Sequence, residues 1–308
     1  MNPLVSIVIP VYNGSNYLGE AIDSALAQTY RDVEVIVVND GSRDDGRTEA
    51  VARKYGDRIR YFAKPNGGCG SALNLGIANM RGEYFSWLSH DDVYYPDKLE
   101  MQVEWMRSQG RMDDVLYGDY DVIGPDGKIR ERILVKPVEP KWFRAATMIT
   151  GFAHGCALLV PAKCFERNAP FNEALRTTQD YDLWFKLARR WRFSHAPGIF
   201  IKAREHPDRG SIKAFDRAEV DELCLAFLKD VEDMEVDGYN GWTAPRFFKS
   251  LGALYKLRKL PKASEAAFKR GGGKLGLGDA AIYAWLAGKA ADKFLGLLKR
   301  PMSAPLRS

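Results

Sequence analysis

Two adjacent carboxylates close an apolar, aromatic segment of this 308-residue chain. Residues 83–88 read EYFSWL, and Asp91 and Asp92 follow shortly afterwards, outside any charged tract. Hard divalent cations such as Mg²⁺ and Mn²⁺ prefer oxygen ligands and use one or two carboxylates to bridge to substrate phosphates. The pair is therefore a candidate metal site. The simpler alternative is the solvated start of a helix, where the helix dipole favours negative charge.

A third carboxylate, Asp40, ends a second apolar segment, VEVIVVND (33–40). If residues 33–40 and 83–88 form neighbouring parallel strands, their carboxyl ends lie at the same edge of the sheet, where open α/β sheets bind ligands. Asp40 is then expected to line one crevice with Asp91 and Asp92. This expectation favours a metal or nucleotide site over a helix start.

The segment TTQDYDLWFKLARR (177–190) places Asp180 and Asp182 at the start of a predicted amphipathic helix. A role as N-cap accounts for one of the two carboxylates. An Asp held on a rigid helix end can also act as a general base if it reaches the crevice. Both interpretations remain open from these residues alone.

Further along, REHPDRGS (204–211) places Arg204 and His206 on a predicted loop, where they are suited to bind an anionic phosphate. For His206, structural and functional roles fit the sequence equally well. The sequence contains no H-x-x-x-H pair, so a zinc site is not expected.

The elements that would position these residues alternate between strand and helix. Apolar segments predict strands at 4–10, 33–40, 59–64 and 83–88, with amphipathic helical segments between them and another at 95–110. This order indicates an α/β fold with an open, mostly parallel sheet. A hairpin is predicted around Gly124–Gly127. The pattern becomes helical throughout from about residue 215, which suggests domains at 1–214 and 215–308.

Two common nucleotide-binding patterns are missing from the sequence. The glycine-rich segment NGGCG (66–70) follows the third predicted strand, whereas the turn after the first strand lacks G-x-G-x-x-G. No G-x-x-x-x-G-K-[ST] segment occurs either. A nicotinamide-dependent enzyme and a P-loop protein are therefore not expected.

Charge is distributed unevenly, with 14 Lys and Arg against three Asp and Glu in residues 241–308. A basic region of this kind suggests an anionic partner. Nucleic acid is not expected, because no recognised nucleic-acid-binding motif accompanies the charge. An anionic membrane surface fits better, through an amphipathic helix over 283–298 whose apolar face would contain Tyr283, Leu286, Ala290, Phe294, Leu297 and Leu298. Packing of this face on the catalytic domain is the alternative.

The sequence also bears on the compartment. The N-terminus lacks the basic and apolar regions of a secretory signal, and no run of about 18 apolar residues predicts a membrane span. The four cysteines show no CxxC spacing, as expected for free thiols in a reducing environment. We therefore expect a cytoplasmic protein, with peripheral attachment to the inner face of the cell membrane as an open alternative.

Taken together, VSIVIPVYNGSNYLGEAIDSALAQTY, EVIVVNDGSRDD, NGGCGSALNLGIANMRGEYFSWLSHDDVYYPDKLE and TTQDYDLWFKLA resemble the family 2 glycosyltransferases in order and spacing, over roughly residues 4–205. The resemblance implies the GT-A fold, with Asp180 as catalytic base and a Mn²⁺ or Mg²⁺ site at Asp91, Asp92 and His206. It implies a donor-binding set of Pro10, Val11, Tyr12, Asn13, Asp40, Asn66, Gly67, Ser71, Asn74, His90, Asp91 and Arg204.

Two positions depart from the family pattern. Ser89 replaces the first Asp of the family's Asp-x-Asp motif, and Gln179 replaces the Glu of its Glu-Asp pair. The resemblance implies an inverting, hexosyltransferase-class enzyme that moves a sugar from a nucleoside-diphosphate sugar to a saccharide or lipid-linked saccharide. A UDP-sugar is the expected donor, and bacterial cell-surface polysaccharide or glycoconjugate assembly the expected setting. The alternatives are a nucleotidyltransferase and an inactive nucleotide-sugar-binding module.

Overall fold

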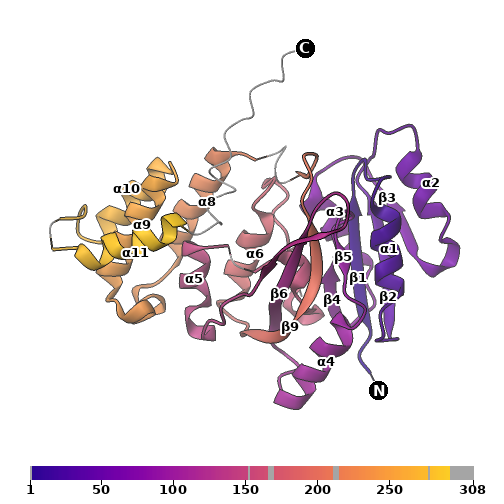
Figure 1. Cartoon of the computed structure of the whole chain (residues 1–308), viewed down its shortest axis with the longest axis horizontal. Helices are drawn as coiled ribbons and strands as arrows, with labels where there is room; N and C mark the ends of the chain where they lie inside the picture. Colours follow the sequence, from indigo (N-terminus) through magenta and orange to yellow (C-terminus); the bar gives the residue numbers. More distant parts are fainter. Residues whose placement is uncertain (1, 152, 166–169, 211–214, 277, 292–308) are drawn as a thin grey trace, which may run out of the picture. The chain divides into compact units, whose positions relative to one another are not determined.

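The computed structural model describes residues 2–151, 153–165, 170–210, 215–276 and 278–291 (Figure 1). The chain forms two compact units. The first comprises residues 1–143 and 152–216, and the second 144–151 and 217–308. The predicted boundary after residue 214 lies outside the described residues. The prediction did not anticipate that residues 144–151 group with the C-terminal helices.

The first unit contains a five-stranded sheet in the order β3-β2-β1-β4-β8. All neighbouring pairs are parallel except β4 and β8, so the prediction of a mostly parallel sheet is confirmed. The first four strands lie where the apolar segments predicted them. The bounds are β1 Val5–Val11, β2 Val33–Asn39, β3 Arg60–Ala63, β4 Tyr84–Trp87 and β8 Val160–Pro161.

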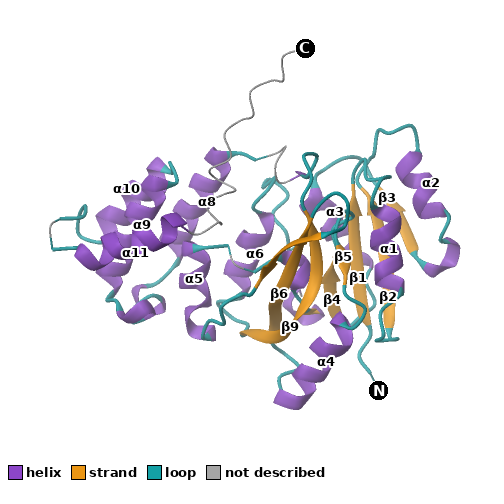
Figure 2. Ribbon diagram, in the orientation of Figure 1, coloured by secondary structure: helices purple, strands orange, loops and turns teal. Residues whose placement is uncertain are grey.

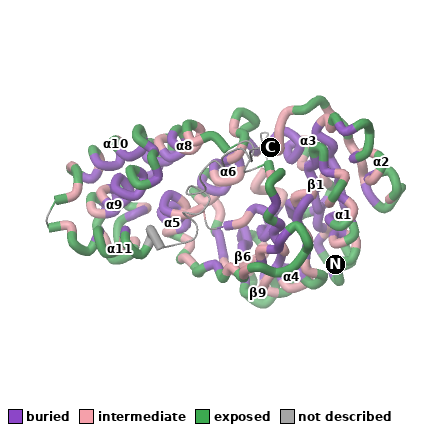
Figure 3. Tube along the Cα trace, turned by 45° about the horizontal axis from the view of Figure 1, so that its top comes forward, coloured by how far each residue is buried: buried purple, intermediate pink, exposed green. Residues whose placement is uncertain are grey.

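Helices cover this sheet, and Figure 2 shows α1 lying over its strands. Both α1 and α3 contact β1 and β2, and every residue of β1 is buried (Figure 3). That burial explains why the β1 sequence is almost wholly apolar instead of alternating. Apart from α5, the α-helices among the described residues of this unit are α1 Leu18–Leu26, α2 Arg47–Arg53, α3 Cys69–Asn79, α4 Lys98–Gln109 and α6 Gln179–Leu187.

A second, mixed sheet has the order β5-β9-β6-β7. The pair β6–β7 forms the predicted hairpin, and Gly127 lies in its turn with φ +76°, a conformation that favours glycine. Strand β9 ends at Arg204, which pairs with Ile123, so the prediction that Arg204 lies on a loop was wrong. The bounds are β5 Val93–Tyr94, β6 Val115–Ile123, β7 Ile129–Ile133 and β9 Phe193–Arg204.

The described part of the second unit is helical. Its elements are α8 Arg217–Asp230, α9 Ala244–Leu257, α10 Pro261–Arg270 and α11 Ala280–Ala291, together with most of α5 Phe143–Ile149. The sequence predicted that Tyr283 and Leu286 lie on one apolar face of a helix over 283–298. In the structure of α11, Leu286 is buried but Tyr283 is about half exposed, so the two residues differ in burial. Residues 292–298 of that predicted helix lie outside the described residues. No described helix is both long and apolar enough to span a membrane.

Candidate active site

The predicted site residues gather where three adjacent strands of the first sheet end. Strand β1 is hydrogen-bonded to β2 on one side and to β4 on the other. The turns that follow these strands carry Tyr12, Asp40 and the Asp91–Asp92 pair respectively. The chain order of apolar segments therefore places residues from distant motifs along one sheet edge.

Asp91 pairs with His206 at this edge. The carboxylate Oδ2 lies 3.0 Å from His206 Nε2, and both residues are buried. Burial alone would raise the pKa of Asp91, but His90 and the hydrogen bond from His206 outweigh it and hold the pKa below its usual value. Asp91 is therefore ionised near neutral pH. A carboxylate oxygen and an imidazole nitrogen at this spacing can share a divalent cation.

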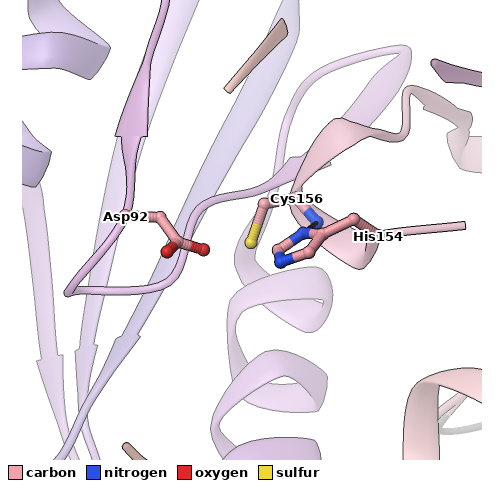
Figure 4. A group of neighbouring side chains, drawn as sticks. All are labelled: Asp92, His154 and Cys156. Atoms are coloured by element: carbon pink, nitrogen blue, oxygen red, sulfur yellow. Dashed lines mark hydrogen bonds between the residues drawn. The ribbon is translucent and has the colours of Figure 1, made fainter. Parts of the chain in front are cut away.

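Asp92, although adjacent in sequence, belongs to another cluster. Its Oδ1 accepts a hydrogen bond from the Arg204 main-chain N–H at 2.9 Å, and its carboxylate faces His154 and Cys156 (Figure 4). Burial, followed by the charge of Asp91, raises the pKa of Asp92 to about 7. Among the described residues, Asp92 groups with His154 and Cys156, whereas Asp91 pairs with His206, and the predicted joint metal site of Asp91, Asp92 and His206 stays a prediction.

Arg204 braces this region from inside the protein. The side chain is only 2% exposed, and its Nε donates to the main-chain oxygen of Asp91 at 2.9 Å. Its Nη2 pairs with Glu20 at 2.5 Å, and its Nη1 lies 3.4 Å from two main-chain oxygens of the β6–β7 turn. Protein acceptors thus occupy the guanidinium, which leaves it poorly placed to bind a phosphate. The contacts favour a positioning role over the predicted donor contact.

Arg209 is a candidate phosphate ligand that the sequence analysis missed. It lies three residues after His206, is partly buried and interacts electrostatically with Asp91 and Asp92. It also acts on His154. A guanidinium in this place suits a phosphate because it offers several donors in a planar fork. The only signal in the sequence was its place in the same loop as His206.

Asp40 is fully engaged by the protein. Its two carboxylate oxygens accept hydrogen bonds at 2.7–3.0 Å from the main-chain N–H groups of Gly67 and Gly68 and from the side chains of Asn66 and Lys64. A carboxylate has about four acceptor positions, so none is left for a ligand. Asp40 therefore fixes the loop that leads into α3. Asn66 and Gly67, which were predicted to contact the donor, instead donate hydrogen bonds to Asp40.

Several other predicted donor contacts also hold the protein together. Asn13 links two turns, because its N–H donates to Ser42 Oγ and its Oδ1 accepts from the Arg43 N–H. The Asn74 side chain bonds both main-chain groups of Phe171 and also Glu173. The last two residues of β1, Pro10 and Val11, are buried, as is Ser71.

Tyr12 and His90 lie differently from those structural residues. The Tyr12 side chain is 43% exposed, which leaves an aromatic surface available beside β1. His90 is partly buried against Gly14, where an added Cβ would lie only 2.3 Å from its ring. Burial lowers the pKa of His90, so the ring is neutral at pH 7. Gly14 is therefore needed for the His90 ring to sit beside the turn after β1.

Asp180 is the second residue of α6 and is partly buried. Burial raises its pKa to about 6, and the hydrogen bond from the Tyr181 N–H to Oδ1, at 2.9 Å, opposes part of that shift. A carboxylate with this pKa suits general-base catalysis near neutral pH. The alternative base, Asp182, is committed to an ion pair with Lys186 at 2.6 Å.

Cys69 lies within electrostatic reach of several of these carboxylates. It is the first residue of α3, and the charges of Asp180, Asp40 and Asp91 all act on its thiol. Burial, followed by these charges, raises the pKa of Cys69 well above its ordinary value. The start of α6 therefore lies close enough to the edge of the sheet for Asp180 and Asp91 to influence one thiol, a proximity that the sequence had left open for Asp180.

Comparison with solved structures identifies the class of fold. The chain superposes on S. aureus TarS in complex with UDP-GlcNAc with a TM-score of 0.64, at 17% identity, covering 96% of this chain and 81% of that one. It also matches the mannosyltransferase PcManGT from Pyrobaculum calidifontis, in complex with GDP-Man and Mn²⁺, with a TM-score of 0.54 at 20% identity, covering 97% and 85%. The first unit thus has the GT-A glycosyltransferase fold, as predicted.

The sequence comparisons identify the family. Residues 6–165 match glycosyl transferase family 2, and the chain belongs to that family. It is 52% identical to an uncharacterized glycosyltransferase of Rickettsia felis over 76% of this chain and 40% of that protein. It is 34% identical to the chondroitin synthase of Pasteurella multocida over 77% of this chain and 24% of that protein. The chain thus spans well under half the length of either relative.

Proposed function

We propose that the protein is an inverting glycosyltransferase that moves a sugar from a nucleoside-diphosphate sugar to a saccharide hydroxyl. The observation that carries this proposal is the buried Asp91–His206 pair at the sheet edge, together with an Asp180 carboxylate close enough that Asp91 and Asp180 both influence the Cys69 thiol. Transfer by a single displacement needs two separate groups: one to hold the leaving diphosphate and another to deprotonate the acceptor. Asp91 has a lowered pKa beside His206, as suits a metal ligand, whereas burial raises the pKa of Asp180 to about 6, as suits a general base.

On the donor side, Asp91 and His206 would hold Mn²⁺ or Mg²⁺, because their oxygen and nitrogen atoms fit such an ion. When bound, the metal supplies charge stabilisation to the departing diphosphate. Arg209 would contact the diphosphate, and the exposed ring of Tyr12 would lie against the base. The complexes of TarS with UDP-GlcNAc and PcManGT with GDP-Man support a nucleotide-sugar donor, with a UDP-sugar favoured.

On the acceptor side, Asp180 would take the proton from the attacking hydroxyl. Its pKa of about 6 keeps it ionised at neutral pH without making it too weak a base. The hydroxyl would attack directly, without a covalent enzyme intermediate, so the anomeric configuration would invert. The likeness to chondroitin synthase supports a polysaccharide acceptor, whether free or lipid-linked.

A basic C-terminal region would place the enzyme on an anionic membrane surface. Residues 241–308 hold 14 Lys and Arg against three Asp and Glu, and each basic group near such a surface contributes about 1 kcal/mol. The full chain should sediment with vesicles containing anionic lipid and detach as salt rises. A chain ending at residue 291 keeps α11 and ten of these 14 basic residues, so it should bind the vesicles more weakly than the full chain. Equal binding by both chains would remove the proposed anchor.

The assay of transfer should separate this function from its alternatives. We expect the full chain with Mn²⁺ and a panel of UDP- and GDP-sugars to release nucleoside diphosphate when saccharide acceptors are present. Release of pyrophosphate from a nucleoside triphosphate and a sugar phosphate would indicate a nucleotidyltransferase instead. Donor binding without turnover across a broad acceptor panel would indicate a binding module.

Arg209→Gln tests the donor geometry against Arg204→Gln. The Arg209 variant should raise the donor KM by roughly 10-fold while leaving the unfolding temperature unchanged, since Arg209 is only partly buried and its charge acts on Asp91 and Asp92. The Arg204 variant should mainly lower the unfolding temperature, because it leaves buried acceptors without donors. The reverse result would restore Arg204 as the phosphate ligand.

A further inference from the structure

Asp92, His154 and Cys156 come together from two segments of the chain. One oxygen, nitrogen or sulfur atom from each residue lies within 4.8 Å of the corresponding atoms of the other two (Figure 4). Asp92 and Cys156 are buried, and His154 is partly exposed. His154 and Cys156 belong to the segment around the 3-10 turn Gly155–Ala157. The role proposed for Asp91 and His206 does not use this cluster.

Main-chain groups orient all three side chains. The Arg204 N–H donates to Asp92 Oδ1 at 2.9 Å, and the Cys156 N–H donates to His154 Nδ1 at 3.3 Å. The Ser89 N–H donates to the Cys156 sulfur at 3.3 Å. The hydrogen bond that Nδ1 accepts favours the tautomer in which Nε2 carries the single proton of the neutral ring. Hydrogen bonds to the groups behind the ligand atoms are typical of metal centres.

Metal binding changes the protonation of the His154 ring in one of two ways. A neutral imidazole has one proton, so coordination through Nε2 moves that proton to Nδ1, which then turns from the Cys156 N–H toward another acceptor. Coordination through Nδ1 instead would replace the 3.3 Å hydrogen bond and leave the Nε2 proton in place. Either mode keeps the ring near Asp92 and the sulfur, and a small movement of His154 is sufficient because that residue is the partly exposed one.

We propose that Asp92, His154 and Cys156 form a zinc-binding site distinct from the donor-metal site. A thiolate, an imidazole and a carboxylate are the three ligand types that Zn²⁺ combines, with water at a fourth position. Mn²⁺ and Mg²⁺ instead prefer sites made of oxygen ligands, so the sulfur selects against them. Binding replaces the thiol proton of Cys156 with the metal, and that proton passes to solvent.

The sequence gave no sign of this site, because it lacks the H-x-x-x-H pair that is typical of many zinc sites. The ligands come instead from His154 and Cys156, two positions apart, and from Asp92, more than sixty residues earlier. Asp92 also adjoins Asp91, which holds the donor metal in the proposed function. A second divalent charge beside Asp91 opposes binding of the donor metal, so zinc at this site inhibits transfer. This inhibitory effect rests on the proposed function, whereas the binding itself does not.

Cobalt provides a test of binding that is independent of activity. The full chain, stripped with a chelator and dialysed, should develop a near-ultraviolet thiolate-to-cobalt charge-transfer band on titration with Co²⁺, and one equivalent of Zn²⁺ should remove it. Cys156→Ser should abolish the band, while Cys224→Ser, a buried cysteine in the second unit, should retain it. Absence of the band in the wild-type protein, or its persistence in Cys156→Ser, would overturn the proposal.

Two further variants guard against misfolding and assign the other ligands. His154→Gln and Asp92→Asn should each weaken cobalt binding by about 10-fold or more, as loss of a partner in a metal centre does. Asp92→Asn keeps an oxygen for the Arg204 N–H, so its unfolding temperature should stay close to that of the wild type. Cobalt affinity unchanged in both variants would show that Cys156 binds metal without this cluster.

The inhibitory effect has its own experiment. In the presence of saturating Mn²⁺, micromolar Zn²⁺ should reduce the transfer rate several-fold in the wild-type protein. Cys156→Ser should be resistant to the same zinc concentration while showing near-normal transfer without it. Equal inhibition of both proteins would place the inhibitory zinc at another site. If zinc inhibits neither protein, the proposed regulation is refuted, and the cobalt titration alone then decides whether the site binds metal.

Discussion

The two units of the protein use buried charge in different ways. In the second unit, the Arg144 side chain is buried and pairs with Asp230 and Glu235, and Asp221 accepts two main-chain N–H groups from the start of α10. At the sheet edge of the first unit, Asp92 and Asp180 have raised pKa values because burial is not fully compensated. Incomplete compensation of this kind is common at functional sites.

This contrast also divides the carboxylates of the first unit. Asp40 lies among the candidate site residues, yet four protein donors occupy it, as donors occupy Asp221 in the second unit. Asp91 and Asp180 keep fewer protein partners and lie near the same thiol. Position at the end of a strand is therefore not enough to indicate a ligand contact, because the hydrogen-bond partners decide the role.

The largest expected effect is at Asp91. Asp91→Asn should reduce kcat/KM by about 10³-fold, because losing the metal's charge stabilisation costs several kcal/mol. Chelation with EDTA should abolish transfer by the wild-type protein, and added Mn²⁺ should restore it. Donor titrations with and without Mn²⁺ should show that the variant has lost the metal-dependent part of binding. Chelator-resistant transfer would return Asp91 to a structural role.

The next largest effect is expected at Asp180. Asp180→Asn should lower kcat by roughly 10²-fold or more, since the acceptor loses its general base, while donor affinity stays unchanged. Wild-type kcat should rise with pH through about 6 and then level off, because the base acts only when ionised. The rise should be missing from the variant. Asp182→Asn is the matched control and should retain most activity, and a larger loss there would exchange the two roles.

Asp40 tests whether a carboxylate at the sheet edge can be purely structural. Asp40→Asn should reduce the free energy of unfolding by about 2 kcal/mol, because buried hydrogen bonds to a charged group are lost. The donor Kd of the folded protein should change little. Urea denaturation and calorimetric donor titration measure the two quantities separately. Weaker donor binding at unchanged stability would instead place Asp40 in contact with the nucleotide.

The smallest effect is expected at Asp221. Asp221→Ala should lower the free energy of unfolding by about 1–2 kcal/mol, because the start of α10 loses the acceptor of two main-chain N–H groups. Asp221→Asn keeps one oxygen and should lose less. Transfer by the folded variants should stay at the wild-type level at 25 °C. A loss of transfer in folded protein would show that this buried carboxylate also serves the reaction.

The sequence by itself determined the strands, the class of fold and the family. Continuous apolar segments such as 4–10 can be buried on both faces only in a covered sheet, so they indicate parallel α/β structure directly. The same pattern placed Asp40 and Asp91 at strand ends, and the helix periodicity placed Asp180 at the start of α6. These are local properties, and local patterns of polarity and spacing are sufficient to encode them.

Only the tertiary structure decided which groups each side chain contacts. Asp91 and Asp92 are neighbours in sequence, yet one pairs with His206 and the other lies with His154 and Cys156. Arg204 has a structural role because β9 places its side chain among hydrogen-bond acceptors of the protein. Such partners come from distant segments, and spacing along the chain does not specify which way a side chain turns after its strand ends. Packing of those segments sets the available donors, acceptors and burial, and these fix each residue's role.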